Sequence, residues 1–370
     1  MSHVVELASG TLFLDVTRAE LPLEALCGFA DRHSSRRSFL FVSKVLGKHV
    51  PVRPSRMAEI HALIAEGIAP TLPGPVAFVA LAETAIGLGQ SVYEAYRERT
   101  GREDTMFLHS TRYAVGTGER LAFSEAHSHA PSHLLHLPPE ARTRANFEHA
   151  RSLVLVDDEI STGNTLTNAV LAIRSRAGAL SSVTCACITD WSGQSPSLAA
   201  RVGLPVSFVS ALEGSFRFEQ KLGAPSPPAP RVEATEFEAK DAVLSGNFGR
   251  QGILDLPPLR GLPALSPVPQ RVLVLGTGEF LYLPFKLAQA LEAAGHEVEF
   301  QSTTRSPVHL GGAIGHRLVL VDNYFDGMPN FLYNAQPGAH DVVIACYETP
   351  RLPPEHDLPA RLGARLWVPT

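Results

Sequence analysis

Short apolar runs of strand length recur along the chain, and most lead through a loop into a segment with helical spacing. Two of them are apolar on both faces, as in the buried strands of a parallel sheet, at residues 75–81 and 153–156, and further strands are predicted at residues 183–189 and 206–210. Helical spacing is present at residues 57–68 and 166–173. Strands that alternate with helices predict an α/β fold with a doubly wound parallel sheet.

Other segments extend this sheet and then lead into a second domain. Residues 11–16 and 104–110 predict strands, and residues 22–32 predict a short helix. Residues 223–230 shift to Ala, Ser and Pro, a composition typical of a linker. We therefore expect two domains, at residues 1–235 and 236–370.

The second domain repeats the strand and helix pattern on a smaller scale. Strands are predicted at residues 271–275, from Val298, and at residues 318–322 and 341–346, with a helix that ends at Gly295. This pattern predicts a smaller, Rossmann-like α/β domain with a parallel sheet. Gly276 and Gly278 lack the third glycine of the dinucleotide fingerprint, which argues against a nicotinamide cofactor.

Composition narrows the classes of function. The chain has 370 residues, 45% of them hydrophobic, and a net charge of −5, so about two globular domains are expected, with no general attraction to nucleic acid or anionic membranes. No apolar segment approaches the roughly 18 residues of a membrane helix, and a cytoplasmic location is expected. The four cysteines are scattered and indicate neither disulfides nor zinc.

The most informative stretch follows the strand at residues 153–156. Asp157 and Asp158 come at the carboxyl end of that strand, where open α/β sheets bind their ligands. The loop that follows is rich in hydroxyls and leads into a helix N-terminus, a natural anion site; its residues are Glu159, Ser161, Thr162, Gly163, Asn164 and Thr165. Paired carboxylates beside a phosphate cradle suit a phosphorylated sugar, whose cis-hydroxyls donate hydrogen bonds to the acids.

A second strand, loop and helix offer another anion cradle. The strand at residues 75–81 is followed by Ala82, Glu83 and Thr84 and then by a predicted helix N-terminus. Basic residues beside a glycine turn upstream, around Lys44, are a further candidate for a diphosphate contact, with solvated surface lysines as the alternative.

A long connection at residues 111–134 carries a group of imidazoles. Glu125, His127, His129 and His133 lie close together in it. One interpretation is a zinc site, although the spacing predicts no defined coordination geometry. The other is a mobile lid at residues 114–133 whose imidazoles move protons near neutral pH.

The string from Val154 to Thr165 resembles the phosphoribosyl diphosphate (PRPP) signature of type I phosphoribosyltransferases. Thr304-Arg305-Ser306-Pro307, with Gly-x-Gly-Glu-Phe upstream and Asp-Asn-Tyr-Phe downstream, resembles the TRSP domain that is fused to phosphoribosyltransferases of the PRTase_2 kind. The two resemblances together cover nearly the whole chain. Such fusions occur among bacterial genes associated with tellurite resistance and stress, where synthesis of a nucleoside-like metabolite is proposed.

The resemblance implies a transferase that uses PRPP and Mg²⁺ to move a 5-phosphoribosyl group to an unidentified base-like acceptor, with release of diphosphate. It implies that Asp157 and Asp158 hold the ribose and the metal, and that the Ala82 loop, Lys44 and Arg112 contact the diphosphate. Lid chemistry is expected from Glu125, His127 or His129. The expected partners are PRPP and a small-molecule acceptor, with a homodimer allowed. The alternatives are a degenerate sensor of PRPP or nucleotide, and an enzyme that runs in the reverse direction.

The second domain is expected to carry its own ligand site. In a parallel sheet, its loops at residues 276–279, 303–306 and 322–323 converge on one edge. Arg305 has the donors for a phosphate or carboxylate, while Glu279 and Asp322 are candidates to hold hydroxyls or a metal. The alternative is an interdomain contact in which Arg305 pairs with an acid of the first domain.

Overall fold

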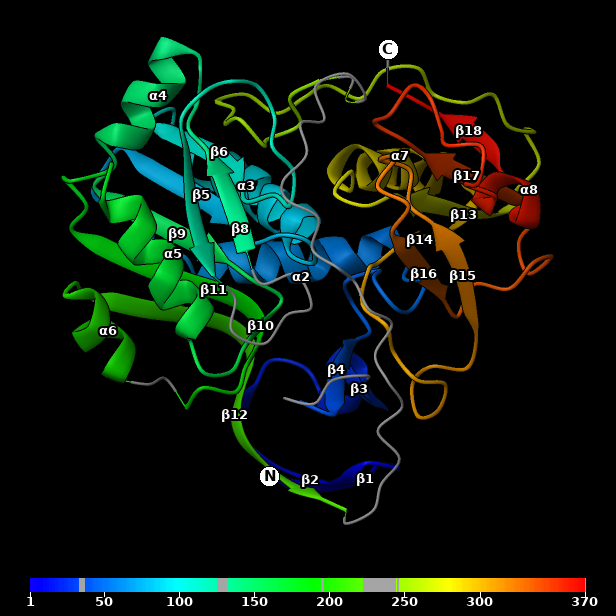
Figure 1. Ribbon diagram of the computed structural model, residues 1–370, viewed down its shortest axis with the longest axis horizontal. Helices are drawn as coiled ribbons and strands as arrows, with labels where there is room; N and C mark the ends of the chain where they lie inside the picture. Colours follow the sequence, from blue (N-terminus) through cyan, green and yellow to red (C-terminus); the bar gives the residue numbers. More distant parts are fainter. Residues whose placement is uncertain (33–36, 125–131, 194–195, 222–243, 245, 370) are drawn as a thin grey trace.

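The chain folds into two α/β lobes that lie side by side (Figure 1). The computed structural model describes residues 1–32, 37–124, 132–193, 196–221, 244 and 246–369. We call the lobe that contains the larger sheet the first domain, and the lobe built from residues 271–369 the second domain. Among the described residues, no helix is both long and apolar enough to cross a membrane.

The first domain is built on an eight-stranded sheet. Its strands are β1 (Ser2–Glu6), β2 (Gly10–Ala19), β5 (Val76–Ala80), β6 (Thr105–His109), β9 (Ser152–Val156), β10 (Glu159–Ile160), β11 (Ser182–Asp190) and β12 (Val206–Gln220). Their order is β1-β2-β12-β11-β9-β5-β6, with β10 beside β11. The strands from β12 to β6 are parallel, whereas β2 runs antiparallel to β12 and β1 antiparallel to β2. Every residue of β5, β6 and β9 is buried, as the unbroken apolar runs predicted.

Helices cover both faces of this sheet. One face carries α2 (Pro54–Gly67) and α3 (Ile86–Thr100), and the other carries α4 (Ala141–Glu148), α5 (Asn164–Arg174) and α6 (Pro196–Val202). Alternate side chains of β5 and β9 enter the two cores, because successive residues of a strand point to opposite faces. The doubly wound parallel sheet expected from the sequence is therefore confirmed.

Two hairpins beside this sheet differ from the prediction. The segment predicted as a helix at residues 22–32 is a one-turn helix α1 (Leu23–Leu26) followed by β3 (Cys27–Asp31), which pairs antiparallel with β4 (Phe39–Ser43). The long connection at residues 111–134, for which no strand was predicted, contains β7 (Arg120–Ser124), paired with β8 (Ser132–His136). In both cases pairing with a later strand decides the backbone, which local helical spacing does not reveal.

The second domain has a four-stranded parallel sheet. Its strands are β13 (Arg271–Gly276), β14 (Glu297–Ser302), β17 (Val342–Cys346) and β18 (Arg365–Trp367), in the order β14-β13-β17-β18. Helix α7 (Tyr282–Ala293) packs on one face, and α8 (Leu358–Leu362) lies on the other. The predicted strand at residues 318–322 is not part of this sheet. It is β15 (Arg317–Val321), which forms a separate antiparallel ribbon with β16 (Pro329–Tyr333), joined by the loop at residues 322–328.

The two domains share a hydrophobic core. Val52 and Met57 of the first domain belong to the same apolar cluster as Phe285 and Phe300 of the second. Val52 and Phe300 also exchange two backbone hydrogen bonds, at 3.0 and 2.7 Å. Further along the interface, Ile253 pairs with Phe107 at the edge of the larger sheet. The predicted domain boundary at 235/236 falls outside the described residues and stays a proposal.

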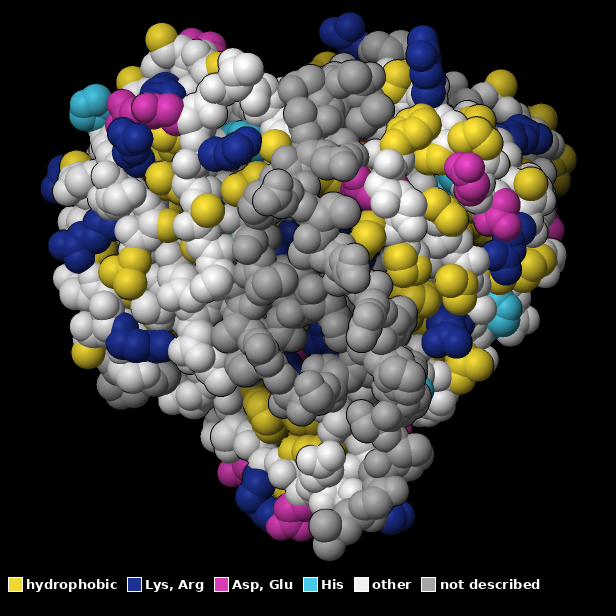
Figure 2. Space-filling model, in the orientation of Figure 1, with side chains coloured by type: hydrophobic (Ala, Val, Ile, Leu, Met, Phe, Trp, Pro, Cys, Tyr) yellow, Lys and Arg dark blue, Asp and Glu magenta, His cyan; other side chains and the backbone are white. Residues whose placement is uncertain are grey.

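The visible surface carries mixed charge. On the face drawn in Figure 2, the described Lys and Arg side chains are scattered over both lobes and are interspersed with Asp and Glu. This distribution agrees with the weakly acidic composition of the chain.

Candidate functional site

A cavity of ≈ 220 Å³ lies between the carboxyl ends of the first domain's strands and the second domain. The first domain contributes residues 81–84 and 157–166, together with side chains from the β3–β4 hairpin and from residues 43–49. The second domain contributes Thr304, Arg305 and Ser306. The cavity therefore unites the two predicted anion cradles with the motif that was expected to serve a separate site.

Asp157 and Asp158 open the cavity at the end of β9. The strand pairing continues into them, since Asp157 N–H donates to the Ala186 carbonyl at 3.0 Å and the Asp158 carbonyl accepts from Ile188 at 3.2 Å. The Asp157 carboxylate also accepts the Asp158 N–H at 3.0 Å. Partial burial, with the Glu159 carboxylate nearby, raises the pKa of Asp158 to about 6. Two adjacent acids are thus held at the cavity by a rigid strand end.

The loop after these acids is shaped by Gly163. This residue has φ +68 and precedes the first residue of α5, so the chain turns in the left-handed region that glycine adopts easily. Arg201 holds the loop from outside, donating to Asn164 Oδ1 at 2.7 Å and to the Thr162 carbonyl at 3.3 Å. Residues 161–165 all line the cavity, where the N-terminus of α5 favours an anion.

The second cradle lies beside the first because β5 and β9 are neighbouring strands. Leu81 N–H donates to the Val156 carbonyl at 3.0 Å, and Ala82 N–H donates to Ser110 Oγ at 2.8 Å. Ala82, Glu83 and Thr84 then face the cavity, just before α3 begins. Arg112 also lines the cavity and donates to the Ala82 carbonyl at 3.4 Å.

The fold places the two lysines near Gly47 in different environments. Lys44 is exposed and donates to the Glu24 carbonyl at 2.9 Å, away from the cavity. Lys48 is instead buried and forms an ion pair with Glu83 at 2.7 Å. Lys44 therefore does not line the cavity, and Lys48 is the lysine near Gly47 that contacts the Ala82 loop.

Of the candidate residues in the connection at residues 111–134, the structure describes only His133 and Arg112. Glu125, His127 and His129 lie outside the described residues. His133 lines the cavity, bonded to Ser110 Oγ through Nδ1 at 2.9 Å and stacked on Phe123 at 4.8 Å between ring centroids. Within the described residues, no group of three or more His, Cys, Asp or Glu side chains is placed to hold a metal ion.

One wall of the cavity was missed by sequence reasoning. Arg37 forms an ion pair with Glu159 at 2.8 Å, and its guanidinium lies 4.6 Å from the centroid of the Phe39 ring. Phe41 lines the cavity and stacks on Trp191, with ring centroids 4.7 Å apart. The available signal was the placement of Arg37, Phe39 and Phe41 at every second position, which puts them on one face of a strand. His49 adds a neutral imidazole to this side, because burial, with Lys48 and Arg32 nearby, lowers its pKa to about 3.

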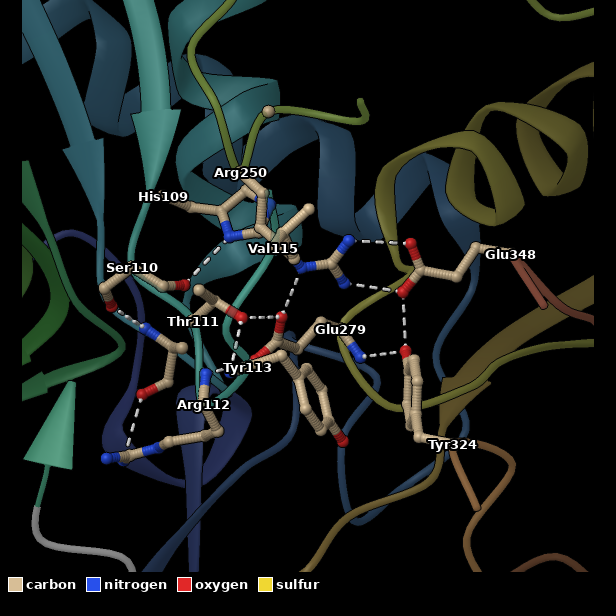
Figure 3. A network of polar contacts seen from close by, with 12 residues as sticks. His109, Ser110, Thr111, Arg112, Tyr113, Val115, Arg250, Glu279, Tyr324 and Glu348 are labelled. Carbon is tan, nitrogen blue, oxygen red and sulfur yellow. Dashed lines mark hydrogen bonds and ion pairs between the residues drawn. The ribbon is translucent and has the colours of Figure 1, made fainter. Parts of the chain in front are cut away.

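A buried polar network joins the two domains beside the cavity (Figure 3). Glu279 accepts hydrogen bonds from Thr111 Oγ1 at 2.6 Å, from Arg112 N–H at 2.8 Å and from Arg250 Nε at 2.8 Å. Arg250 also donates to both carboxylate oxygens of Glu348, at 2.9 and 2.6 Å. Burial alone would raise the pKa of Glu279, but Arg250 and the hydrogen bonds outweigh it and lower the pKa to about 2.

This network corrects the expectation of a separate ligand site in the second domain. Glu279 is committed to the interface, and Asp322 is fully buried, accepting from the N–H groups of Tyr324 and Met328 at 2.7 Å each. Asp322 therefore stabilises the turn between β15 and β16. Arg305 faces the shared cavity, where its partners are the Tyr113 hydroxyl and Asp326 of its own domain, so the predicted pairing with an acid of the first domain is not what holds it.

Close packing at Gly278 gives a test of this network. A Cβ at Gly278 would lie 2.3 Å from Cε2 of Tyr324, whose hydroxyl donates to Glu348 at 2.6 Å. Gly278→Ala is expected to displace that ring and to lower the free energy of unfolding by about 1–3 kcal/mol, measured by urea denaturation. Gly363→Ala is the control, because Gly363 has a similar φ of +60 with nothing within 4 Å of its Cβ position. Equal losses in the two variants would show that only the backbone cost matters.

Comparisons with known proteins agree with this architecture. Residues 26–215, just over half of the chain, match the PRTase_2 family of phosphoribosyl transferases, and residues 263–360 match the TRSP domain that lies C-terminal to PRTase_2. A comparison with curated proteins found no match.

Solved structures of phosphoribosyltransferases are similar at low identity. Adenine phosphoribosyl transferase from Trypanosoma brucei, in complex with AMP, pyrophosphate and ribose-5-phosphate, is 14% identical, with a TM-score of 0.36, and the match covers 56% of this chain and 86% of that one. Orotate phosphoribosyltransferase from Aeropyrum pernix is 18% identical, with a TM-score of 0.29 and coverage of 47% and 79%. On the family match, the chain belongs to the PRTase_2 family of phosphoribosyl transferases and carries a C-terminal TRSP domain.

Proposed function

We propose that the protein transfers the 5-phosphoribosyl group of PRPP to a base-like acceptor and releases diphosphate. The observation that carries this proposal is the meeting of three groups in one cavity: the Asp157–Asp158 pair, the hydroxyl-rich loop at the N-terminus of α5, and the Ala82–Thr84 loop. Each of these three groups has the chemistry to bind one part of PRPP.

Each group has a chemical task in this proposal. The ribose hydroxyls donate hydrogen bonds to the carboxylates of Asp157 and Asp158, which are acceptors when ionised. The 5-phosphate binds the amides and hydroxyls of residues 161–165, where the helix dipole favours negative charge. The diphosphate lies toward residues 82–84, across the ribose from the 5-phosphate, with Arg112 alongside.

The donor set is compatible with Mg²⁺. This ion is usually held by one or two carboxylates together with substrate phosphates and water, not by an all-protein cage. Asp157 and Asp158 supply such a pair, in line with the lack of a larger ligand cluster among the described residues. When bound, the ion neutralises charge on the diphosphate leaving group.

The acceptor is expected on the side of the cavity walled by Phe41 and Leu40, with Arg37 and His49 nearby. An aromatic ring beside cationic and imidazole groups suits a flat heterocycle. The cellular product, proposed as a nucleoside-like metabolite, and a cytoplasmic homodimer stay predictions.

Calorimetry with PRPP and Mg²⁺ is the first test, followed by diphosphate release across a panel of purine and pyrimidine bases and other heterocycles. Micromolar PRPP binding with release for at least one acceptor is expected. Binding without release for any acceptor would favour the sensor alternative. Absence of PRPP binding would exclude both.

The role of the predicted acid or base residues is tested separately. His127→Ala and His129→Ala are expected to lower turnover more than they lower PRPP affinity, since a group that acts in the transition state affects kcat more than binding. Steady-state kinetics and calorimetry on the same preparations give the two values. Stoichiometric zinc in the wild type that is lost in these variants would instead support the metal interpretation.

A further inference from the structure

Arg305 of the TRSP domain lines the same cavity as the PRPP-type loops of the transferase domain. Its side chain is 19% exposed and is held from both domains. Nη2 donates to the Tyr113 hydroxyl of the transferase domain and to Asp326 of the TRSP domain at 3.2 Å, and the guanidinium lies 5.0 Å from the centroid of the Tyr113 ring. The guanidinium is therefore fixed before any ligand arrives, which lowers the entropic cost of binding.

The Arg305 guanidinium lines the cavity with part of its donor set unused. Among the described residues, Arg305 donates hydrogen bonds only through Nη2, although an arginine has five N–H donors in a planar fork. Thr304 and Ser306 line the cavity beside it and add hydroxyl donors. Such a fork suits bidentate contact with the oxygens of a phosphate or carboxylate.

Arg305 lies on the diphosphate side of the cavity. It lines the cavity together with Ala82, Glu83 and Thr84. Tyr113, which holds Arg305, is the neighbour of Arg112, whose side chain reaches the Ala82 carbonyl at 3.4 Å. Arg201 holds the 5-phosphate cradle from outside the cavity, through Asn164 and the Thr162 carbonyl.

The Ala82 loop needs cations from elsewhere. Lys48, the buried ammonium beside it, is paired with Glu83 at 2.7 Å. A diphosphate carries several negative charges, and a partly buried site cannot hold them without further positive groups. Arg305 and Arg112 line the same cavity as this loop, and Arg112 donates to its Ala82 carbonyl at 3.4 Å.

We propose that Arg305 of the TRSP domain binds the diphosphate group of the transferase substrate, so that the active site is built from both domains. The inference rests on the proposed function for the identity of the substrate, but it makes a separate claim about which end of that substrate the second domain holds. It also accounts for the covalent fusion of the two domains, because the TRSP motif completes a site that the transferase domain leaves open.

The test compares three probes on Arg305→Gln in the full-length protein. Calorimetry with PRPP, inorganic diphosphate and ribose 5-phosphate, each with Mg²⁺, should show roughly 10-fold or greater weakening for the first two. Ribose 5-phosphate lacks the diphosphate, so its affinity should stay within about twofold of wild type. Arg351→Gln, an exposed arginine of the same domain, is the matched control and should bind all three probes like wild type.

The outcomes separate this inference from the proposed function. Unchanged diphosphate affinity in Arg305→Gln would overturn the inference, and so would equal weakening for all three probes, which indicates a structural role. A wild type that binds no diphosphate also overturns it. Selective loss of diphosphate binding in a protein that never transfers ribose from PRPP would sustain the inference and remove the proposed transferase activity.

Discussion

Arg250→Met is expected to lower the free energy of unfolding by about 3–5 kcal/mol, the cost of removing one partner of a buried ion pair. In the wild type, Arg250 is 3% exposed and lies between Glu279 and Glu348, which are 2% and 0% exposed. The variant leaves two carboxylates buried without a cation. Urea denaturation monitored by tryptophan fluorescence and by circular dichroism measures the loss.

The same variant has a defined pH dependence. The pKa of Glu279 in the folded wild type is about 2, below its ordinary 4.5, so its contribution to stability is present above about pH 4.5 and disappears as the pH falls toward 2. In Arg250→Met, burial without the cation raises the carboxylate pKa values, and acid relieves the penalty. The difference between wild type and variant should therefore be larger near pH 8 than near pH 5.

Arg271→Met is the control for this prediction, because Arg271 forms an exposed pair with Asp341, and exposed pairs contribute little. A variant of Arg250 that is as stable as this control, or whose deficit does not change with pH, would mean that the network does not hold the domains together. Loss of PRPP binding is expected to accompany the instability, because Glu279 also positions Thr111 and Arg112.

Asp157→Asn and Asp158→Asn are each expected to weaken PRPP binding by about 1–3 kcal/mol, the scale for loss of a charge-assisted hydrogen bond. Both carboxylates line the cavity at the end of β9, and asparagine keeps their size while removing the charge that, in the proposed function, binds the ribose hydroxyls and the metal. Calorimetry with PRPP and Mg²⁺ gives the affinities, and thermal unfolding checks that the variants remain folded.

Asp190→Asn is the matched control for the charge. Asp190 ends the neighbouring strand β11, where its carboxylate accepts from Ser192 N–H at 2.8 Å and does not line the cavity. Its variant should bind PRPP like wild type. An equal loss of PRPP affinity in Asp190→Asn would show that the effect comes from the net charge of the protein and not from contact with PRPP. Unchanged PRPP affinity in both Asp157→Asn and Asp158→Asn would show that these residues do not bind PRPP.

The sequence alone predicted the features that depend on residues close together in the chain. Apolar runs predicted the buried strands β5, β6, β9 and β11, because a strand covered on both faces needs no alternation. The position of Asp157 and Asp158 at a strand end, and of Gly163 before a helix, follows from the same local order. Since parallel strands present their carboxyl ends at one edge, the two cradles could be expected to lie together.

The tertiary structure decided everything that depends on partners far apart in the chain. The β3–β4 hairpin that carries the aromatic wall, the choice of Lys48 over Lys44 and the ribbon of β15 with β16 arise from pairing and burial that no short window contains. Arg305 lines the same cavity as the Ala82–Thr84 loop, more than two hundred residues earlier, because α7 packs on α2 and α3 and β14 packs on α2. Local pattern thus determined which chemistry each domain carries, and packing between the domains determined that this chemistry meets in one site.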